Sequence, residues 1–171
     1  MHYFLLNAQQ KDSTKVTKFK KNAFYISFYS QFTLNYERIL FVKNKNIIIA
    51  RLSGAYWENN INYSNFGKNP TNNTYLGVGL IYARSFKNPK HHLNIELFYL
   101  HVKGTDPSLQ PSIARNYPYL ANLYAIKSGW RRQKSDGGWL WRVNASTGKM
   151  VEDESLTTTV FYPEVCLGYS F

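Results

Sequence analysis

The sequence has no apolar run long enough to form a membrane-spanning helix. Its longest apolar stretches lie in NIIIA and YLGVGLIYA, whereas a transmembrane helix needs about 20 consecutive, predominantly apolar residues. Charged residues are also few, at 18% of the chain, yet the mean hydropathy of -0.42 is polar. These values exclude a helical membrane protein and indicate a chain in which apolar and polar residues alternate.

Cysteine is nearly absent, and no group of metal ligands stands out. Cys166 is the single cysteine, which excludes an intrachain disulfide; we expect it to be a small packing residue on the inner face of a strand. His91 and His92 are adjacent, and adjacent residues of a strand point in opposite directions, so the two cannot easily share one metal ion. The sequence therefore predicts neither a metal site nor a cofactor.

Acidic residues are scarce, with 10 Asp and Glu against 21 Lys and Arg, for a formal net charge of +11. The basic residues concentrate in the N-terminal tail and in FVKNKN, FKNPKHH and RRQKSDGG, while most of the remaining exposed acids lie in three other connections, around Glu58, Asp106 and VEDES. This separation favours contact of one rim with anionic lipid headgroups over a nucleic-acid groove. A set of merely solvated turns would carry the same charges.

Aromatic residues are abundant, at 17% of the chain, and they alternate with polar residues. In the final stretch, PEVCLGYSF, every second residue from Val165 to Phe171 is large and apolar. Since successive side chains of a strand point to opposite faces, this pattern predicts a strand with one apolar face. Similar alternation occurs at residues 22–40, 46–57, 74–86, 92–102, 119–133, 139–146 and 157–171.

The number of these segments, counted back from the C-terminus, indicates how many strands a transmembrane barrel would have. Transmembrane strands need about 9 to 11 residues. With both termini on the periplasmic side the strand number is even, so we expect residues 22–40 to break near Ser30 and Gln31. The sequence therefore predicts an all-β, closed antiparallel transmembrane β-barrel of eight strands, with short basic periplasmic turns and longer outer loops at 58–73 and 103–118. Eight strands leave an interior that side chains fill, so no channel is expected.

The predicted domain organisation has two parts. Residues 1–21 form a lysine-rich periplasmic tail that begins with a signal-peptide remnant, and residues 22–171 form the outer-membrane barrel. In MHYFLLNAQQKDS a short apolar stretch precedes a small residue and then polar residues, so the remnant is expected to end between Ala8 and Gln10. An ordinary N-terminal tail is the alternative.

Charged residues on the polar face of the strands are expected to fill the lumen. They carry both signs, and an unpaired buried charge is costly, so we predict a structural ionic network; a catalytic or proton-linked role is the alternative. The residues are Glu37, Arg51, Glu96, Lys127, Arg131, Arg142 and Glu164.

Aromatic residues also stand near the expected ends of strands. Trp130, Trp139 and Trp141 flank the KSDGG turn, and Tyr56 and Trp57 precede the first long loop. Because girdles of aromatic residues mark both membrane interfaces of outer-membrane barrels, we predict that these five are interface residues. Core aromatics of a soluble barrel are the alternative.

Four stretches together resemble a known family: KNAFYISFYSQFTLNYER, KHHLNIELFY, GWRRQKSDGGWLWRV and PEVCLGYSF. In order and spacing they are similar to a family of small outer-membrane β-barrel proteins common in Bacteroidota, over residues 22–171. The matching positions are 35–38, 91–93, 129–133 and 167–171. Trp130 replaces the family's usual Tyr, and Ser30 and Gln31 stand where glycines are frequent. The resemblance implies a Gram-negative outer-membrane location and carries over no catalytic residues.

The C-terminus looks like the signal that the barrel-assembly machinery reads in outer-membrane proteins. Leu167, Tyr169 and Phe171 would form this signal. The last strand must also pair with the first so that no edge stays open. We therefore expect the assembly machinery and outer-membrane lipid as partners, and no nucleic acid.

Three functions compete at this stage. The favoured one is a non-enzymatic barrel without an open pore, acting as a structural or accessory subunit of a larger outer-membrane complex. The alternative is a lipid-modifying enzyme, similar to a lipid A deacylase or acyltransferase, in which His101 would act with Glu96, Ser108 or Ser112; no spacing motif supports it. A soluble lipocalin-like barrel would require the reverse burial, with Glu37 and the other charges outside.

Overall fold

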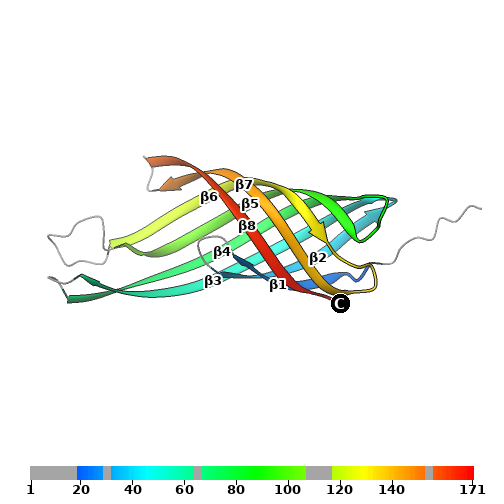
Figure 1. Cartoon of the computed structure of the whole chain (residues 1–171). Coiled ribbons are helices and arrows are strands. Elements are labelled where there is room, and N and C mark those ends of the chain that lie inside the picture. The colour runs from blue at the N-terminus through cyan, green and yellow to red at the C-terminus, as the bar shows by residue number, and fades with distance from the viewer. Residues whose placement is uncertain (1–18, 29–31, 64–66, 107–116, 153–155) are drawn as a thin grey trace, which may run out of the picture.

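The computed structural model describes residues 19–28, 32–63, 67–106, 117–152 and 156–171, and within these ranges the side chains at 57–72, 105–119 and 152–158 lie outside the description. Eight strands follow one another along the chain (Figure 1). Their bounds are Asn22–Phe28 (β1), Phe32–Lys43 (β2), Asn46–Tyr63 (β3), Gly67–Ser85 (β4), His91–Asp106 (β5), Tyr117–Arg132 (β6), Gly138–Glu152 (β7) and Leu156–Ser170 (β8). None of the described residues belongs to a helix long and apolar enough to cross a membrane.

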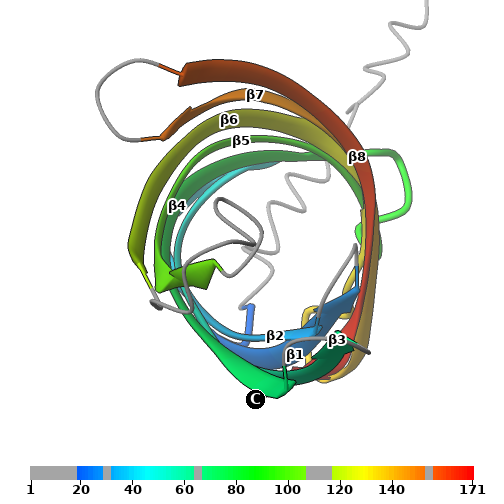
Figure 2. The same cartoon turned by 90° about the vertical axis from the view of Figure 1, so that its left-hand side faces the viewer.

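The strands form one closed antiparallel barrel. Each strand pairs with the next in sequence, and β8 pairs with β1, which Figure 2 shows as a continuous ring seen along the barrel. The backbone N–H of Asn22 donates to the carbonyl of Phe171, and the N–H of Phe171 donates to the carbonyl of Asn22. The predicted eight-strand antiparallel barrel is confirmed, with β1 and β2 on either side of residues 29–31.

The two ends of the barrel differ, and we call them the turn end and the loop end. Three connections, at 44–45, 86–90 and 133–137, lie at the turn end, and both β1 and β8 meet there through Asn22 and Phe171. Asn44 and Gly137 have φ values of 56° and 95°, a region that Asn tolerates and Gly enters freely. The loop end is the opposite end of the barrel, where the described strands stop at Phe28, Tyr63, Asp106 and Glu152 and begin again at Phe32, Gly67, Tyr117 and Leu156.

The predicted loop at 58–73 is largely strand, so that part of the prediction is wrong, whereas the predicted loop at 103–118 is strand at its two ends and its middle lies outside the described residues. β3 and β4 stay paired from Trp57 and Asn73 out to Tyr63 and Gly67, and β5 and β6 stay paired out to Asp106 and Tyr117. The register established in the barrel continues into these hairpins, so each backbone satisfies its partner's hydrogen bonds. Strand propensity depends on such context more than on composition.

The two faces of the strands have opposite polarity. Outward side chains are large and apolar, including Leu34 at 69% exposed and Leu97 at 59%, whereas Glu37, Arg51 and Glu96 are at most 2% exposed. A soluble lipocalin-like barrel needs the reverse arrangement, so that alternative is wrong for this chain.

Candidate functional site in the barrel lumen

The seven charged residues assigned to the lumen from sequence all lie buried inside the barrel. Each is at most 2% exposed. Four are cations and three are carboxylates, so this layer has a net charge of +1 (4 - 3). Burial of one unpaired ion costs on the order of several kcal/mol. The stability of this layer therefore depends on which of its charges form ion pairs. They come from β2 (Glu37), β3 (Arg51), β5 (Glu96), β6 (Lys127 and Arg131), β7 (Arg142) and β8 (Glu164).

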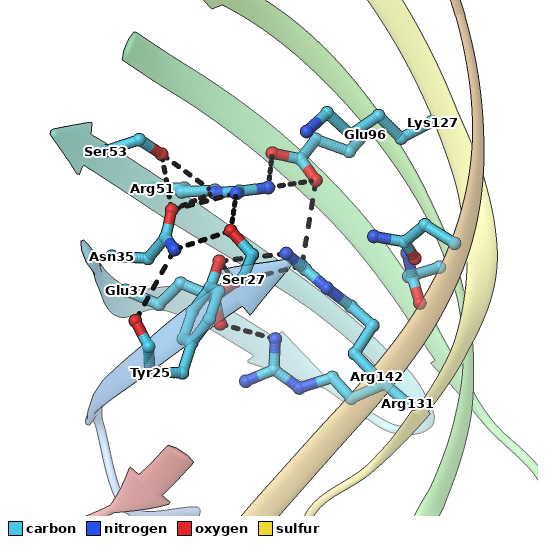
Figure 3. A network of polar contacts seen from close by, with 12 residues as sticks. Tyr25, Ser27, Asn35, Glu37, Arg51, Ser53, Glu96, Lys127, Arg131 and Arg142 are labelled. Atoms are coloured by element: carbon cyan, nitrogen blue, oxygen red, sulfur yellow. Dashed lines mark hydrogen bonds and ion pairs between the residues drawn. The ribbon is translucent and has the colours of Figure 1, made fainter. Parts of the chain in front are cut away.

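Glu37 joins two arginines that face each other. Arg131 and Arg142 are directly opposite partners on β6 and β7, and like charges in that position are destabilising. Nη1 of Arg131 donates to Oε2 of Glu37, and Nη1 of Arg142 donates to Oε1 at 3.0 Å. The Tyr25 hydroxyl donates to the same Oε1 at 2.7 Å and accepts from Nη2 of Arg142 at 2.9 Å (Figure 3). One carboxylate therefore accepts hydrogen bonds from two guanidinium groups and a phenol.

Arg51 is the centre of the other half of the network. Its Nη1 donates to both oxygens of Glu96, at 2.9 and 3.0 Å, and its Nη2 donates to Oε1 of Glu164 at 2.8 Å. Oδ1 of Asn35 accepts from Nε at 3.0 Å and from Nη2 at 2.8 Å (Figure 3). A guanidinium has five N–H donors in a fixed plane, so Arg51 can hold partners from three strands at once.

Lys127 and Arg142 connect the remaining carboxylates. Nζ of Lys127 donates to Oε2 of Glu164 at 3.2 Å and lies 3.9 Å from the ring centroid of Phe98, within the range of a cation–π interaction. Nη1 of Arg142 lies 3.6 Å from Oε2 of Glu96, which links the Glu37 and Arg51 halves. The charges therefore form one continuous network.

A glycine makes room for the network on β4. A Cβ atom at Gly79 would lie 2.5 Å from Oε1 of Glu96, closer than real side chains approach. Gly79 is the ladder partner of Arg51, so its missing side chain leaves the space in which Glu96 reaches Arg51.

Apolar side chains fill the lumen on both sides of the ionic layer. Toward the loop end the packed cluster is Phe98, Leu100, Val102, Ala121, Leu123 and Ala125. Toward the turn end it is Ile39, Ile47, Ile49, Ile81 and Ala83. Phe19 packs against this second cluster, and its ring meets that of His92 edge-on at 5.7 Å. The described lumen is thus a stack of packed layers.

The lumen network offers no free carboxylate for catalysis. Glu37, Glu96 and Glu164 all form ion pairs. His101 faces outward, where its ring Nδ1 lies 2.9 Å from Oδ1 of Asn122, and Glu96 points into the lumen from the same strand. The pairing of His101 with Glu96 considered from sequence is wrong, because residues five apart on a strand point to opposite faces; Ser108 and Ser112 lie outside the described residues.

The adjacent His91 and His92 point to opposite faces of β5. His91 stacks on the outward Trp130 ring at a centroid distance of 5.0 Å, and His92 is buried with Nδ1 2.9 Å from the Ser85 hydroxyl. Within the described ranges, no three His, Cys, Asp or Glu side chains lie where they could hold a metal ion. Cys166 is buried and free.

The aromatic residues predicted to mark interfaces lie on the outward face wherever their side chains are described. Trp130 and Trp141 pack edge-on at 4.3 Å near the turn end, and Trp139 there is 69% exposed. Tyr56, on the loop side of β3, is 62% exposed; the side chain of Trp57 is outside the description. Their contact with a membrane interface stays a prediction.

The C-terminal residues form the seam that closes the barrel. Leu167 and Tyr169 pair with Ile26 and Phe24 of β1, and the Phe171 ring stacks on Phe24 at 5.7 Å. All three predicted signal residues are about half exposed on the outward face, at 50%, 54% and 48%. Their recognition by an assembly machinery stays a prediction.

Sequence reasoning missed several members of the network. Tyr25, Asn35 and Phe98 contact its charges directly. The first two alternate with the outward Phe24 and Leu34, so the period-two pattern already put them inside. Phe19, which packs against the turn-end apolar cluster and not in the network, could not be found from the period-two pattern because it lies before the first strand.

No protein-family model and no curated protein matches this sequence. Among solved structures, the chain is similar to the N-terminal β-barrel domain of Pseudomonas aeruginosa OprF, with a TM-score of 0.54. The match covers 88% of this chain and 96% of that chain at 10% sequence identity. At this identity the likeness shows the barrel fold alone.

Proposed function

We propose that this chain is a small outer-membrane β-barrel protein of a Gram-negative bacterium, with the turn end in the periplasm. The observation that carries the proposal is the inverted burial, with large apolar side chains outside and paired charges inside. Large apolar side chains on the outside suit contact with lipid. In addition, a closed barrel leaves no backbone group unpaired in hydrocarbon. The outward Trp139 and Tyr56 toward opposite ends match the expected girdles.

We further infer a non-enzymatic role as a structural or accessory subunit of a larger outer-membrane complex. The packed layers of the described lumen argue against a pore, and the ion-paired carboxylates argue against acid–base chemistry inside the barrel. The outward face and the long hairpins at the loop end then supply the contact surfaces. The sequence resemblance to small barrels of Bacteroidota agrees with this role.

Membrane fractionation followed by gentle purification tests both parts of the proposal. We expect the chain in the outer-membrane fraction, folded as a species whose electrophoretic mobility changes on heating, together with a stoichiometric larger barrel or lipoprotein. Recovery in the soluble fraction would refute the location. Recovery in the outer membrane as a monomer without a partner would refute the accessory role alone.

A further inference from the structure

An apolar trough crosses the outward face of the barrel from β4 to β7. Its floor is the backbone of one cross-strand row in which Gly79, Phe98, Ala125 and Gly148 are successive partners. One wall runs from Val78 to Lys149 and the other from Leu80 to Thr147, and the cavity has a volume of about 940 Å³. Three strand spacings make the trough about 14 Å long.

The two ends of the trough differ in chemistry. Over β4 to β6 its wall is apolar, with Leu80, Leu97 and Ile126 each at least 50% exposed. At β7 the exposed Lys149 stands between its ladder partners Tyr124 and Thr159. The six ion pairs among the described residues do not include Lys149. The trough therefore suits an amphiphile with an acidic group at one end.

The position of Lys149 along β7 indicates which side of a membrane it would reach. Trp139, near the turn end of the same strand, lies ten residues earlier (149 - 139). Ten residues span about 33 Å along a strand, or about 25 Å along the axis at a tilt of about 40°. This is the height of the apolar band in outer-membrane barrels, so Lys149 stands at the level of the outer headgroups.

We propose that the trough binds a phosphorylated, multiply acylated glycolipid of the outer leaflet. Acyl chains lie along Leu80, Leu97 and Ile126, and a phosphate contacts the Lys149 ammonium. Tyr124, the ladder partner of Lys149, and Thr147, two residues before it on β7, also line the trough, and their ring and hydroxyl suit a sugar ring better than a glycerol headgroup. The proposal rests on the outer-membrane location proposed above.

Lipid binding to the full-length protein in detergent tests this assignment. The probes are bis-phosphorylated lipid A, the same lipid after dephosphorylation, and phosphatidylglycerol, each titrated and followed by native mass spectrometry. We expect one tightly bound lipid A, and about a tenfold weaker affinity for the dephosphorylated lipid and for Lys149→Gln, because one charge-assisted contact is lost. Thr147→Trp should weaken lipid A binding by filling the trough.

Lys103→Gln is the matched control, because Lys103 is also exposed on the outward face near the loop end but lies outside the trough. It should bind like the unmodified protein. Unchanged affinity of Lys149→Gln, or equal binding of the dephosphorylated lipid, would overturn the proposal. Equal binding of phosphatidylglycerol would overturn the glycolipid assignment. All three results leave the outer-membrane location intact, since fractionation and heat-dependent mobility test that location separately.

Discussion

Arg131 and Arg142 face each other across the β6–β7 ladder, and the shortest carboxylate contact of each is to Glu37. Glu37 reaches them across the lumen from β2, so a contact that spans the barrel neutralises a repulsion within one hairpin. Tyr25 adds a hydroxyl to the same carboxylate. At the scale of the residue, these ion pairs link strands on opposite sides of the barrel through their side chains.

Replacing Glu37 with Gln tests this role. The substitution keeps the shape of the side chain but raises the net charge of the ionic layer from +1 to +2 (4 - 2). Because it leaves the buried Arg131 without its charged partner and Arg142 with only the 3.6 Å contact to Glu96, we expect a loss of about 3–5 kcal/mol in the free energy of unfolding. Urea unfolding of the protein in lipid vesicles measures this loss.

Asp136→Asn is the control for that measurement. It also removes one carboxylate, but at an exposed position in the 133–137 turn, where substitutions change stability by only about 0.5 kcal/mol. Equal urea midpoints for the two variants would show that Glu37 does not hold the arginines together.

At the scale of the element, β8 and β1 are unequal partners. β8 has 15 residues and β1 has 7, and their pairing runs from Ala23 and Ser170 to Phe28 and Val165. Among the described residues, the remainder of β8 has ladder partners on β7 alone. Closure of the barrel therefore depends on the last seven residues of the chain, where the predicted assembly signal also lies.

Phe171→Ala separates a recognition signal from a packing role. The Phe171 ring is about half exposed and contributes one stacked contact with Phe24, so we expect the purified variant to refold into vesicles nearly as well as the unmodified chain. In cells, by contrast, we expect less than half of the folded protein in the outer membrane. The measurement is the heat-dependent mobility shift in both settings.

Phe161→Ala is the matched control on the same strand, because Phe161 is 76% exposed and far from the C-terminus. It should assemble normally in cells. If Phe171→Ala and Phe161→Ala assemble to the same extent, the terminal residue is not a signal.

At the scale of the whole molecule, three layers close the part of the lumen that the structure describes. The apolar cluster around Leu123, the ionic layer around Arg51 and the apolar cluster around Ile49 follow one another from the loop end to the turn end. An ion crossing the described lumen would have to pass both apolar clusters and the ionic layer. Opening a path would require two separate clusters to repack, which close-packed interiors resist.

Planar bilayers containing the purified protein should therefore show no stable conductance steps. Single-channel recording over a range of voltages measures this, with a protein-free detergent sample and a heat-denatured sample as controls. Steps of uniform size that appear only with the folded protein would contradict the closed lumen and the non-porous role together.

Alternation in the sequence determined seven strand segments and their two faces, and the requirement that both termini share one side of the membrane raised the strand number to eight. Tyr25, Glu37 and Arg51 had to point inward once Phe24, Tyr36 and Leu52 pointed outward, because the side-chain period of a strand is two. The identity of the lumen charges follows from this period alone. Their partners do not, because Glu37 meets Arg131 and Arg142 across a space whose width only barrel closure sets.

Tertiary structure also determined features that the composition of the sequence does not indicate. The segment from Glu58 to Asn73 is rich in Asn and its composition indicates a loop, yet its described residues form paired strand because the β3–β4 register continues out to Tyr63 and Gly67. Phe19 lies outside any alternating segment and packs against the turn-end cluster because the closed barrel presents an apolar surface there. The trough that ends at Lys149 likewise exists only after four strands come into register. Periodicity is local along the chain, whereas closure and register join residues distant in sequence.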